Sequence, residues 1–251
     1  MKKPERLGPY TLIAPLGERT RARTWLARAG DPVQGEQVAL KLARPKDTAG
    51  RARILHEVDI AGGFDHPNIV RIHECGEANG VLWLASGYVS GPHRPLKLVN
   101  FRQLLLALVH VHANEVIHAD INCQNMLLDE EGDLRLSNFA SARRFGEPGQ
   151  AGTGAPQCMP PEQRRGDALD VRSDLYAAGA VLYEILTNAA PQPAPGDGFA
   201  PPSSIAPGLG TSFDALMQKA LAPAPEARFA SAFELLSAFD AACKRGVRPP
   251  G

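Results

Sequence analysis

The stretch His118-Ala-Asp-Ile-Asn-Cys-Gln-Asn-Met-Leu-Leu128 places a histidine, a carboxylate and two amides directly before a short apolar strand. Asp120 lies two residues after His118, and Asn125 lies five residues after Asp120. The assignment of the fold starts from this spacing and from the motifs that surround it.

Further motifs occur in a fixed order on both sides of this loop: Val38-Ala-Leu-Lys41, Glu57, His66-Pro-Asn-Ile-Val70, Pro161-Glu162, Asp170-Val-Arg-Ser-Asp174 and Arg228. Together with the loop, whose pattern is close to His-Arg-Asp-x-x-x-x-Asn, the series resembles eukaryotic-type protein kinases and above all bacterial Ser/Thr kinases. The resemblance covers about Leu7 to Ala242. It implies an α+β, two-lobed protein-kinase-like fold with a small β-rich N-lobe and a larger helical C-lobe.

The hydrophobic pattern agrees with this division. Alternating apolar residues predict strands over 10–13, 24–27, 37–42, 69–72 and 81–84, and helical spacing predicts a helix around 54–61. Longer helices are predicted over 101–113 and about 172–187, 211–221 and 230–243. We therefore expect an N-lobe at 1–87, a C-lobe at 88–243, and a tail or the start of a linker at 244–251.

Composition excludes several other classes of protein. The 27 Lys and Arg balance 27 Asp and Glu, so no overall field favours nucleic acid or an anionic membrane. Apolar residues make up 44% of the chain, and no apolar run approaches the roughly 20 residues of a membrane span. The four scattered cysteines show neither a metal-ligand spacing nor a disulfide framework. We expect a reduced, cytoplasmic protein that has no membrane segment within this chain.

The resemblance assigns chemical roles to four intact positions. Phosphoryl transfer depends mainly on positioning and on neutralisation of phosphate charge. Lys41 would hold the α- and β-phosphates of ATP, and Glu57 would hold Lys41. Asp120 would orient the attacking hydroxyl as the base, and Asn125 would bind a metal. The alternatives are a plain salt bridge for Lys41 and Glu57 and ordinary loop hydrogen bonds for Asp120 and Asn125.

Further positions match residues that bind adenine in kinases. Ala39 and Leu127 would sandwich the base, Gly17 would begin the phosphate loop, and Tyr88 lies in the hinge. The alternative for Ala39 and Leu127 is that they are ordinary core residues.

A second set is expected to hold the scaffold rather than to touch the nucleotide. Glu162 and Arg228 match a buried ion pair of the C-lobe, and Asp174 matches the residue that supports the loop near His118. Phe139 is assigned to the structural set with them.

Several departures from the kinase pattern concern the phosphate and the metal. The Asp-Phe-Gly motif reads Asn138-Phe139-Ala140, and a neutral amide oxygen is a weaker ligand for Mg²⁺ than a carboxylate. Asn138 and Asn125 therefore predict a degenerate metal site with weak Mg²⁺ binding or none. The catalytic-loop lysine is Asn122, and the threonine that bonds to it is Ala155.

The glycine-rich loop is altered as well. Its second and third glycines are Arg19 and Ala22, whose side chains obstruct a close approach of the backbone to phosphate. Arg19, Arg21 and Arg23 alternate, which is typical of a solvated basic face; the alternative is that they neutralise phosphate. A single helix is expected between Gly91 and His118 where kinases usually have two. The surface that the missing helix uncovers is either a partner site or simply the result of a shorter chain.

Three functions remain for comparison. The first is a pseudokinase that acts as a binding or regulatory module for a protein partner, with weak or metal-independent nucleotide binding. The alternative is an unorthodox active Ser/Thr protein kinase that transfers the γ-phosphate of ATP with Asp120 as the base. A small-molecule phosphotransferase of the aminoglycoside-kinase type shares the His-x-Asp loop but lacks the series from Glu162 to Arg228.

Overall fold

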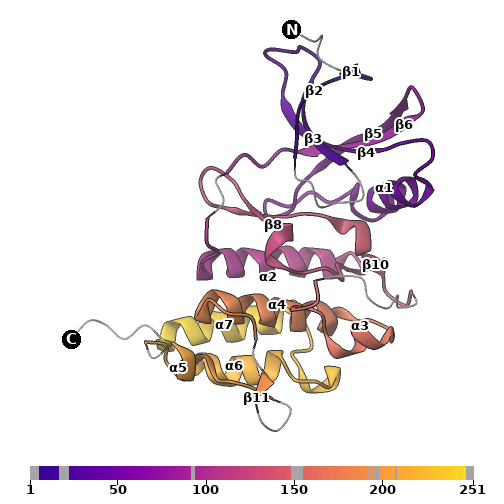
Figure 1. Cartoon of the computed structure of the whole chain (residues 1–251). Coiled ribbons are helices and arrows are strands. Elements are labelled where there is room, and N and C mark those ends of the chain that lie inside the picture. The colour runs from indigo at the N-terminus through magenta and orange to yellow at the C-terminus, as the bar shows by residue number, and fades with distance from the viewer. Residues whose placement is uncertain are drawn as a thin grey trace.

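A sheet-based lobe lies above a helical lobe, and the catalytic loop lies where the two meet (Figure 1). The structure is a computed structural model that describes residues 6–16, 23–91, 94–147, 155–191, 193–194, 198–206 and 208–246. The two-lobed fold expected from the sequence is confirmed.

The N-lobe is built on one six-stranded antiparallel sheet with the strand order β1-β2-β3-β4-β6-β5. Its strands are β1 (Arg6–Leu7), β2 (Tyr10–Pro15), β3 (Arg23–Ala29), β4 (Gln37–Ala43), β5 (Ile72–Ala78) and β6 (Val81–Gly87). Successive side chains of a strand point to opposite faces of a sheet. In β4, Val38 and Leu40 are buried in the N-lobe core against Trp83, so Lys41 emerges on the other face.

Helix α1 (Thr48–Ala61) covers that second face of the sheet. It begins at Asp47, whose carboxylate accepts a hydrogen bond from the Gly50 amide at 2.8 Å and so caps the helix. Ile54 and Glu57 are buried one turn apart on the same side of the helix. The spacing of the buried residues therefore brings a carboxylate to the face from which Lys41 emerges.

The C-lobe packs its helices around one large hydrophobic core. The helices are α2 (Leu98–Ala113), α3 (Pro161–Arg165), α4 (Val171–Thr187), α5 (Pro202–Ile205), α6 (Ser212–Ala220) and α7 (Ala232–Gly246). The rings of Phe101 in α2 and Phe239 in α7 meet edge to face, 4.9 Å apart between centroids. Helix α4 lies at the centre of this core, where Leu175 and Val181 are completely buried.

Short strands and 3-10 turns carry the loops between these helices. Their bounds are β7 (Val116–Ile117), η1 (Cys123–Asn125), β8 (Met126–Leu128), β9 (Leu134–Leu136), η2 (Phe139–Ser141), β10 (Arg143–Arg144), β11 (Pro193–Ala194), β12 (Gly198–Phe199) and η3 (Pro225–Ala227). Three antiparallel pairs result, β7 with β10, β8 with β9 and β11 with β12. The β8–β9 hairpin follows the catalytic loop directly.

One predicted strand is wrong. The sequence predicts a strand over residues 69–72, but the strand at this point, β5, begins at Ile72. Ile69 instead forms an isolated bridge with Leu136, and the Val70 amide donates to the Leu136 carbonyl at 2.8 Å. The apolar alternation is present, but its partner is β9 of the C-lobe, so this segment links the two lobes.

The other predicted elements agree with the structure to within a few residues. Among the described helices, none combines the length and apolar character that a membrane span requires. The divisions at 87 and 243 stay predictions.

Candidate active site

Lys41 and Glu57 form a close ion pair between the sheet and α1. The Lys41 ammonium lies 2.6 and 2.7 Å from the two carboxylate oxygens of Glu57. The Glu57 side chain is 6% exposed, whereas that of Lys41 is 21% exposed. The lysine side chain is thus the more exposed of the two, and its ammonium also lies 3.5 Å from Asn138 Oδ1.

Phe139 locks the segment after β9 onto α1. Its backbone amide donates to Glu57 Oε1 at 3.2 Å, and its ring packs edge to face with Phe64 and with His118. Asn138 has a φ of 69° in the left-handed region, where asparagine is tolerated better than most residues. This turn places the Asn138 amide between Lys41 and the catalytic loop.

Asp120 is surrounded by side-chain amides. Asn122 donates to Oδ1 at 2.8 Å, and Asn125 donates to Oδ2 at 2.9 Å. Asn138 makes a longer contact with Oδ2 at 3.4 Å. A carboxylate offers about four lone-pair positions. Three of these are occupied, which leaves room on Oδ1 for one further donor.

The donor set does not fit a kinase-type Mg²⁺ site well. The Asn138 amide nitrogen donates to Asn125 Oδ1 at 3.1 Å as well as to Asp120, while its oxygen faces Lys41. A nitrogen that donates hydrogen bonds cannot ligate a hard cation, which requires oxygen. No group of three or more His, Cys, Asp or Glu residues able to hold a metal occurs among the described residues. The amide group of Asn138 thus occupies the position at which a carboxylate would contribute negative charge to a metal site.

The loop that carries Asp120 is held from below by Asp174, near the start of α4. The amides of His118 and Ala119 donate to the two Asp174 oxygens at 2.8 and 2.9 Å, and His112 Nε2 lies 2.9 Å from Oδ2. Burial by itself would raise the pKa of Asp174, but the hydrogen bond and charge of His112, together with the charge and backbone amide of His118, outweigh it and the net pKa is lowered. Asp174 therefore stays ionised and fixes the loop.

A second buried pair anchors α3 to the loop that precedes α7. Arg228 donates to both Glu162 oxygens, at 2.6 and 2.9 Å, and Ser173 donates to one of them at 2.8 Å. The guanidinium also caps backbone carbonyls and lies over the Tyr176 ring. Burial would raise the pKa of Glu162, but these partners lower it overall. The pair is a bidentate, fully satisfied ionic anchor.

The expected adenine-binding residues come from both lobes. Ala39 lies in β4, and Leu127 lies in β8 with 37% of its surface exposed. Ser86 donates to the Ala39 carbonyl at 3.4 Å across the β4–β6 pair, and Tyr88 follows directly after β6. Gly17, Arg19 and Ala22, together with the Arg23 side chain, lie outside the described residues.

Three contacts around the loop were not predicted. His112 was an unassigned histidine, and its signal was its position six residues before His118 at the end of a helix. Gln163 donates to the Ala119 carbonyl at 2.7 Å, a contact that no sequence signal indicates. Asn122 was noted as a lost lysine, yet its amide contacts Asp120 while its oxygen accepts from the Gln124 amide.

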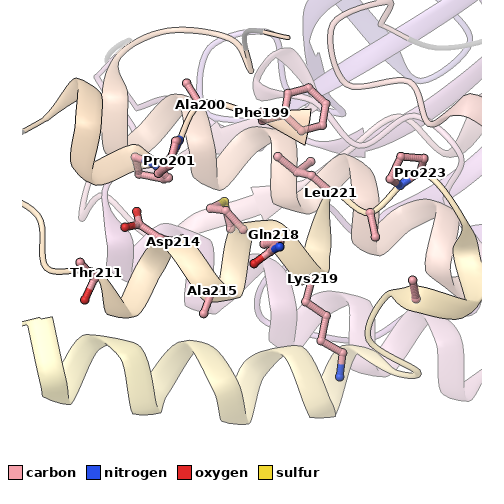
Figure 2. A pocket seen from close by; sticks show the side chains of 14 residues that line it. Phe199, Ala200, Pro201, Thr211, Asp214, Ala215, Gln218, Lys219, Leu221 and Pro223 are labelled. Atoms are coloured by element: carbon pink, nitrogen blue, oxygen red, sulfur yellow. The ribbon is translucent and has the colours of Figure 1, made fainter. Parts of the chain in front are cut away.

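A separate groove of about 870 Å³ lies in the C-lobe (Figure 2), and neither Lys41 nor Asp120 is among its lining residues. Phe199, Met217 and Leu221 contribute its apolar lining. Its charged groups are already paired, since Asp214 accepts two hydrogen bonds from Ser203. Lys219 points away toward α7 and pairs with Glu234 at 2.6 Å. Among its described lining residues, the groove leaves no charge uncompensated.

An ion-paired lysine, an aspartate beside an asparagine and a clamped phenylalanine, all between a sheet lobe and a helical lobe, define a phosphotransferase-type fold. The family model described as "Protein kinase domain" matches residues 10–198. The crystal structure of the Mycobacterium tuberculosis PknI kinase domain, determined on a cysteine-to-alanine mutant, superposes with a TM-score of 0.73 at 25% identity. That match covers 97% of this chain and 99% of the PknI chain.

Curated bacterial proteins give the same result. Serine/threonine-protein kinase PknJ of Mycobacterium tuberculosis is 34% identical over 95% of this chain and 46% of PknJ. Serine/threonine-protein kinase PrkC of Bacillus subtilis is 30% identical over 73% of this chain and 31% of PrkC. The chain belongs to the protein kinase family, among the bacterial Ser/Thr kinases, and spans less than half the length of these relatives.

Proposed function

We propose that this chain binds ATP and transfers its γ-phosphoryl group to a Ser or Thr hydroxyl of a protein, with Asp120 as the base. The observation that carries the proposal is the assembled Lys41–Glu57 pair, which Phe139 clamps against α1. A plain structural salt bridge would not need an exposed lysine, whereas 21% of the Lys41 side chain stays exposed. The relationship to bacterial Ser/Thr kinases supports the same reaction.

The protein's own groups account for the steps of this transfer. Lys41 neutralises charge on the α- and β-phosphates, and Ala39 and Leu127 contact the adenine. The acceptor hydroxyl donates to Asp120 Oδ1, on which a lone-pair position is open beside the Asn122 contact. As the hydroxyl oxygen bonds to the γ-phosphorus, its proton passes to Asp120 and ADP leaves.

The reaction is expected to be slow. Metal stabilisation of a transferring phosphoryl group contributes several kcal/mol, and each ~1.4 kcal/mol changes a rate tenfold. Because the Asn138 amide replaces a carboxylate, much of that stabilisation is missing here. The rate would then lie orders of magnitude below that of a kinase with the complete metal site.

Transfer of ³²P from γ-labelled ATP to the chain itself and to Ser-containing acceptor proteins tests this proposal. Slow incorporation that Asp120→Asn abolishes is the expected result. The matched control is Asp65→Asn, which removes a carboxylate that is 85% exposed and should leave the rate unchanged. Equal incorporation by wild type and Asp120→Asn would contradict the role of Asp120.

The second candidate is a pseudokinase that regulates a protein partner. The donors from Asn122, Asn125 and Asn138 favour it, because they already occupy three of the about four lone-pair positions of Asp120. Calorimetry of ATP binding with and without Mg²⁺ separates the two candidates. Binding that requires Mg²⁺ favours the kinase, whereas binding that is absent or indifferent to Mg²⁺, with no ³²P transfer, favours the pseudokinase.

A further inference from the structure

The peptide unit between Ala119 and Asp120 decides where the Asp120 carboxylate points. Ala119 has a φ of 58°, in the left-handed region that a residue with a Cβ adopts only at a cost. Among the described residues, three of the other four non-glycine residues with positive φ are asparagines, which tolerate this conformation better. Ala119 is buried, with 4% of its surface exposed, and its methyl group forms no hydrogen bond that would offset the cost. The backbone must therefore be held in place by its surroundings.

Gln163 holds the carbonyl side of this peptide unit. Its side-chain amide donates to the Ala119 carbonyl at 2.7 Å, and Gln163 is as deeply buried as Ala119. On the opposite side of the same unit, the Asp120 amide donates to His118 Nδ1 at 3.2 Å. One peptide unit earlier, the Ala119 amide donates to Asp174 Oδ1 at 2.9 Å. Both edges of the peptide unit thus have a partner, and Gln163 supplies the side-chain donor to its oxygen.

The short helix that carries Gln163 is itself fixed. Helix α3 begins at Pro161, and the carboxylate of the neighbouring Glu162 accepts hydrogen bonds from Arg228 and Ser173. Successive residues of a helix point about 100° apart, so the two neighbours contact different parts of the C-lobe. Glu162 contacts Arg228, and Gln163 contacts the catalytic loop. The donor to the strained peptide unit therefore projects from an anchored turn.

We propose that Gln163 is a positioning residue for the phosphoryl transfer. Its hydrogen bond holds Ala119 in the left-handed conformation and so keeps the Asp120 carboxylate turned toward the acceptor hydroxyl. The inference rests on the proposed function, because Asp120 is the base of that reaction. Without the bond, relaxation of Ala119 to negative φ turns the peptide unit and the carboxylate with it. Asn122 and Asn125, whose amides donate to the carbonyl and the carboxylate of Asp120, then lose part of these contacts.

A purely structural role for Gln163 has different consequences. In that case the bond fastens α3 to the loop, and its loss weakens the C-lobe as a whole. The two roles separate in a double-mutant cycle, because only the positioning role makes the effect of Gln163 depend on the φ preference of residue 119. Ala119→Gly removes that preference, since glycine adopts positive φ about as readily as negative φ.

Hydrogen exchange of single backbone amides in the full chain, measured by NMR, tests the proposal without requiring catalysis. Gln163→Met keeps the length of the side chain and removes its donor, so protection of the Asp120 amide should fall about tenfold. The amide of Leu108, in the buried part of α2, should keep its protection. The matched control is Gln218→Met on the exposed side of α6, which should change neither amide.

A second variant keeps the proposal testable if Gln163→Met folds poorly. Ala119→Gly alone relieves the strain at residue 119, so it should raise the protection of the Asp120 amide. In the Ala119→Gly background, Gln163→Met should lower that protection by less than about threefold. An equal loss in both backgrounds would overturn the proposal, as would an Asp120 amide that ignores either single variant. Equal losses at Asp120 and Leu108 would also overturn it, because the role would then be structural.

The kinetics of ³²P transfer give a second readout. Gln163→Met should lower kcat about tenfold or more and leave the KM for ATP unchanged, because Asp120 orients the acceptor hydroxyl whereas Lys41 holds the nucleotide. A raised KM for ATP with an unchanged kcat would contradict the positioning role.

The failure of this inference and the failure of the proposed function give different results. A local loss of protection at Asp120 in Gln163→Met, without any ³²P transfer by the wild type, supports the hold on Asp120 and contradicts the kinase. Transfer that Asp120→Asn abolishes and Gln163→Met leaves unchanged supports the kinase and contradicts the role of Gln163.

Discussion

The two polar centres of the C-lobe have opposite chemistry, although the catalytic loop and α4 lie next to each other. The buried carboxylates of Asp174 and Glu162 accept short hydrogen bonds from a backbone amide and from the charged side chain of Arg228, respectively. Around Asp120, the partners are the neutral amides of Asn122, Asn125 and Asn138. The scaffold has thus kept its ionic groups, while the centre that would handle phosphate and metal has exchanged charged side chains for amides.

The scaffold side of this comparison is expected to be the most sensitive to mutation. Arg228→Ala leaves Glu162 charged and buried, which costs about 3–5 kcal/mol. For a protein of this size, that lowers Tm by roughly 6–20 °C. Thermal unfolding followed by circular dichroism measures the change.

The matched control is Arg165→Ala, which breaks the exposed pair with Asp167. An exposed pair contributes about 0–1 kcal/mol, so Tm should hardly move. Similar losses of Tm in the two variants would show that the buried pair of Arg228 contributes no more to stability than an exposed pair.

The amide-rich surroundings of Asp120, the other side of the comparison, can be altered by placing a carboxylate at position 138. Asn138→Asp places a second negative charge about where the Asn138 amide contacts Asp120 at 3.4 Å. Lys41, whose ammonium lies 3.5 Å from Asn138 Oδ1, offsets part of the repulsion from Asp120. Mg²⁺ should relieve the rest and raise the Tm of this variant above its value in EDTA, whereas Mg²⁺ leaves the wild-type Tm unchanged. The rate of ³²P transfer with Mg²⁺ should rise about tenfold or more, since tenfold corresponds to ~1.4 kcal/mol.

The control for this variant is Asn114→Asp, an exposed site at the end of α2. It should show no response to Mg²⁺. If Mg²⁺ does not change the Tm of Asn138→Asp, the site at position 138 does not hold the ion even with a carboxylate.

A smaller effect is expected at Asn122, which supports Asp120 without a charge. Asn122→Ala removes the donor to Asp120 Oδ1 and the acceptor for the Gln124 amide, at a cost of about 1 kcal/mol. The free energy of unfolding from urea titration should fall by that amount. Asn122→Asp keeps the acceptor but puts a second carboxylate beside Asp120 in place of the donor, so it should lose more stability than Asn122→Ala; a smaller loss would assign the effect to the turn rather than to Asp120.

The smallest effect concerns pH. Burial, and then the nearby His110, lowers the pKa of His66 below its ordinary value of 6.5. A histidine with a lowered pKa binds protons more readily when unfolded, so its contribution to stability is present above about pH 6.5 and declines as pH falls. The urea midpoint should therefore drop between pH 7 and 5, and His66→Gln should reduce that drop. Identical pH profiles would contradict the assignment.

The sequence predicted most of this arrangement because its motifs occur in a fixed order. Lys41, Glu57, Asp120, Asn125 and Asn138 meet in one site. The first two lie on β4 and α1, whose buried residues fix their direction, and the other three lie in the segments that flank the β8–β9 hairpin. One feature depended on longer-range packing. Residues 69–70 pair with β9 rather than with the sheet, and nothing local distinguishes those partners.

The contact between residues 88–91, which follow β6, and the β8–β9 hairpin has a mechanical consequence. Gly91 and Ser90 bind the segment just after the sheet to the hairpin that carries Leu127. A rotation of the N-lobe about residues 88–91 would therefore move the β8–β9 hairpin as well, because the two are in direct contact. Opening and closing of the lobes would tilt the platform beneath the adenine together with its roof. Glycines inserted between Gly87 and Ser90 would uncouple the movement of the N-lobe from that of the β8–β9 hairpin.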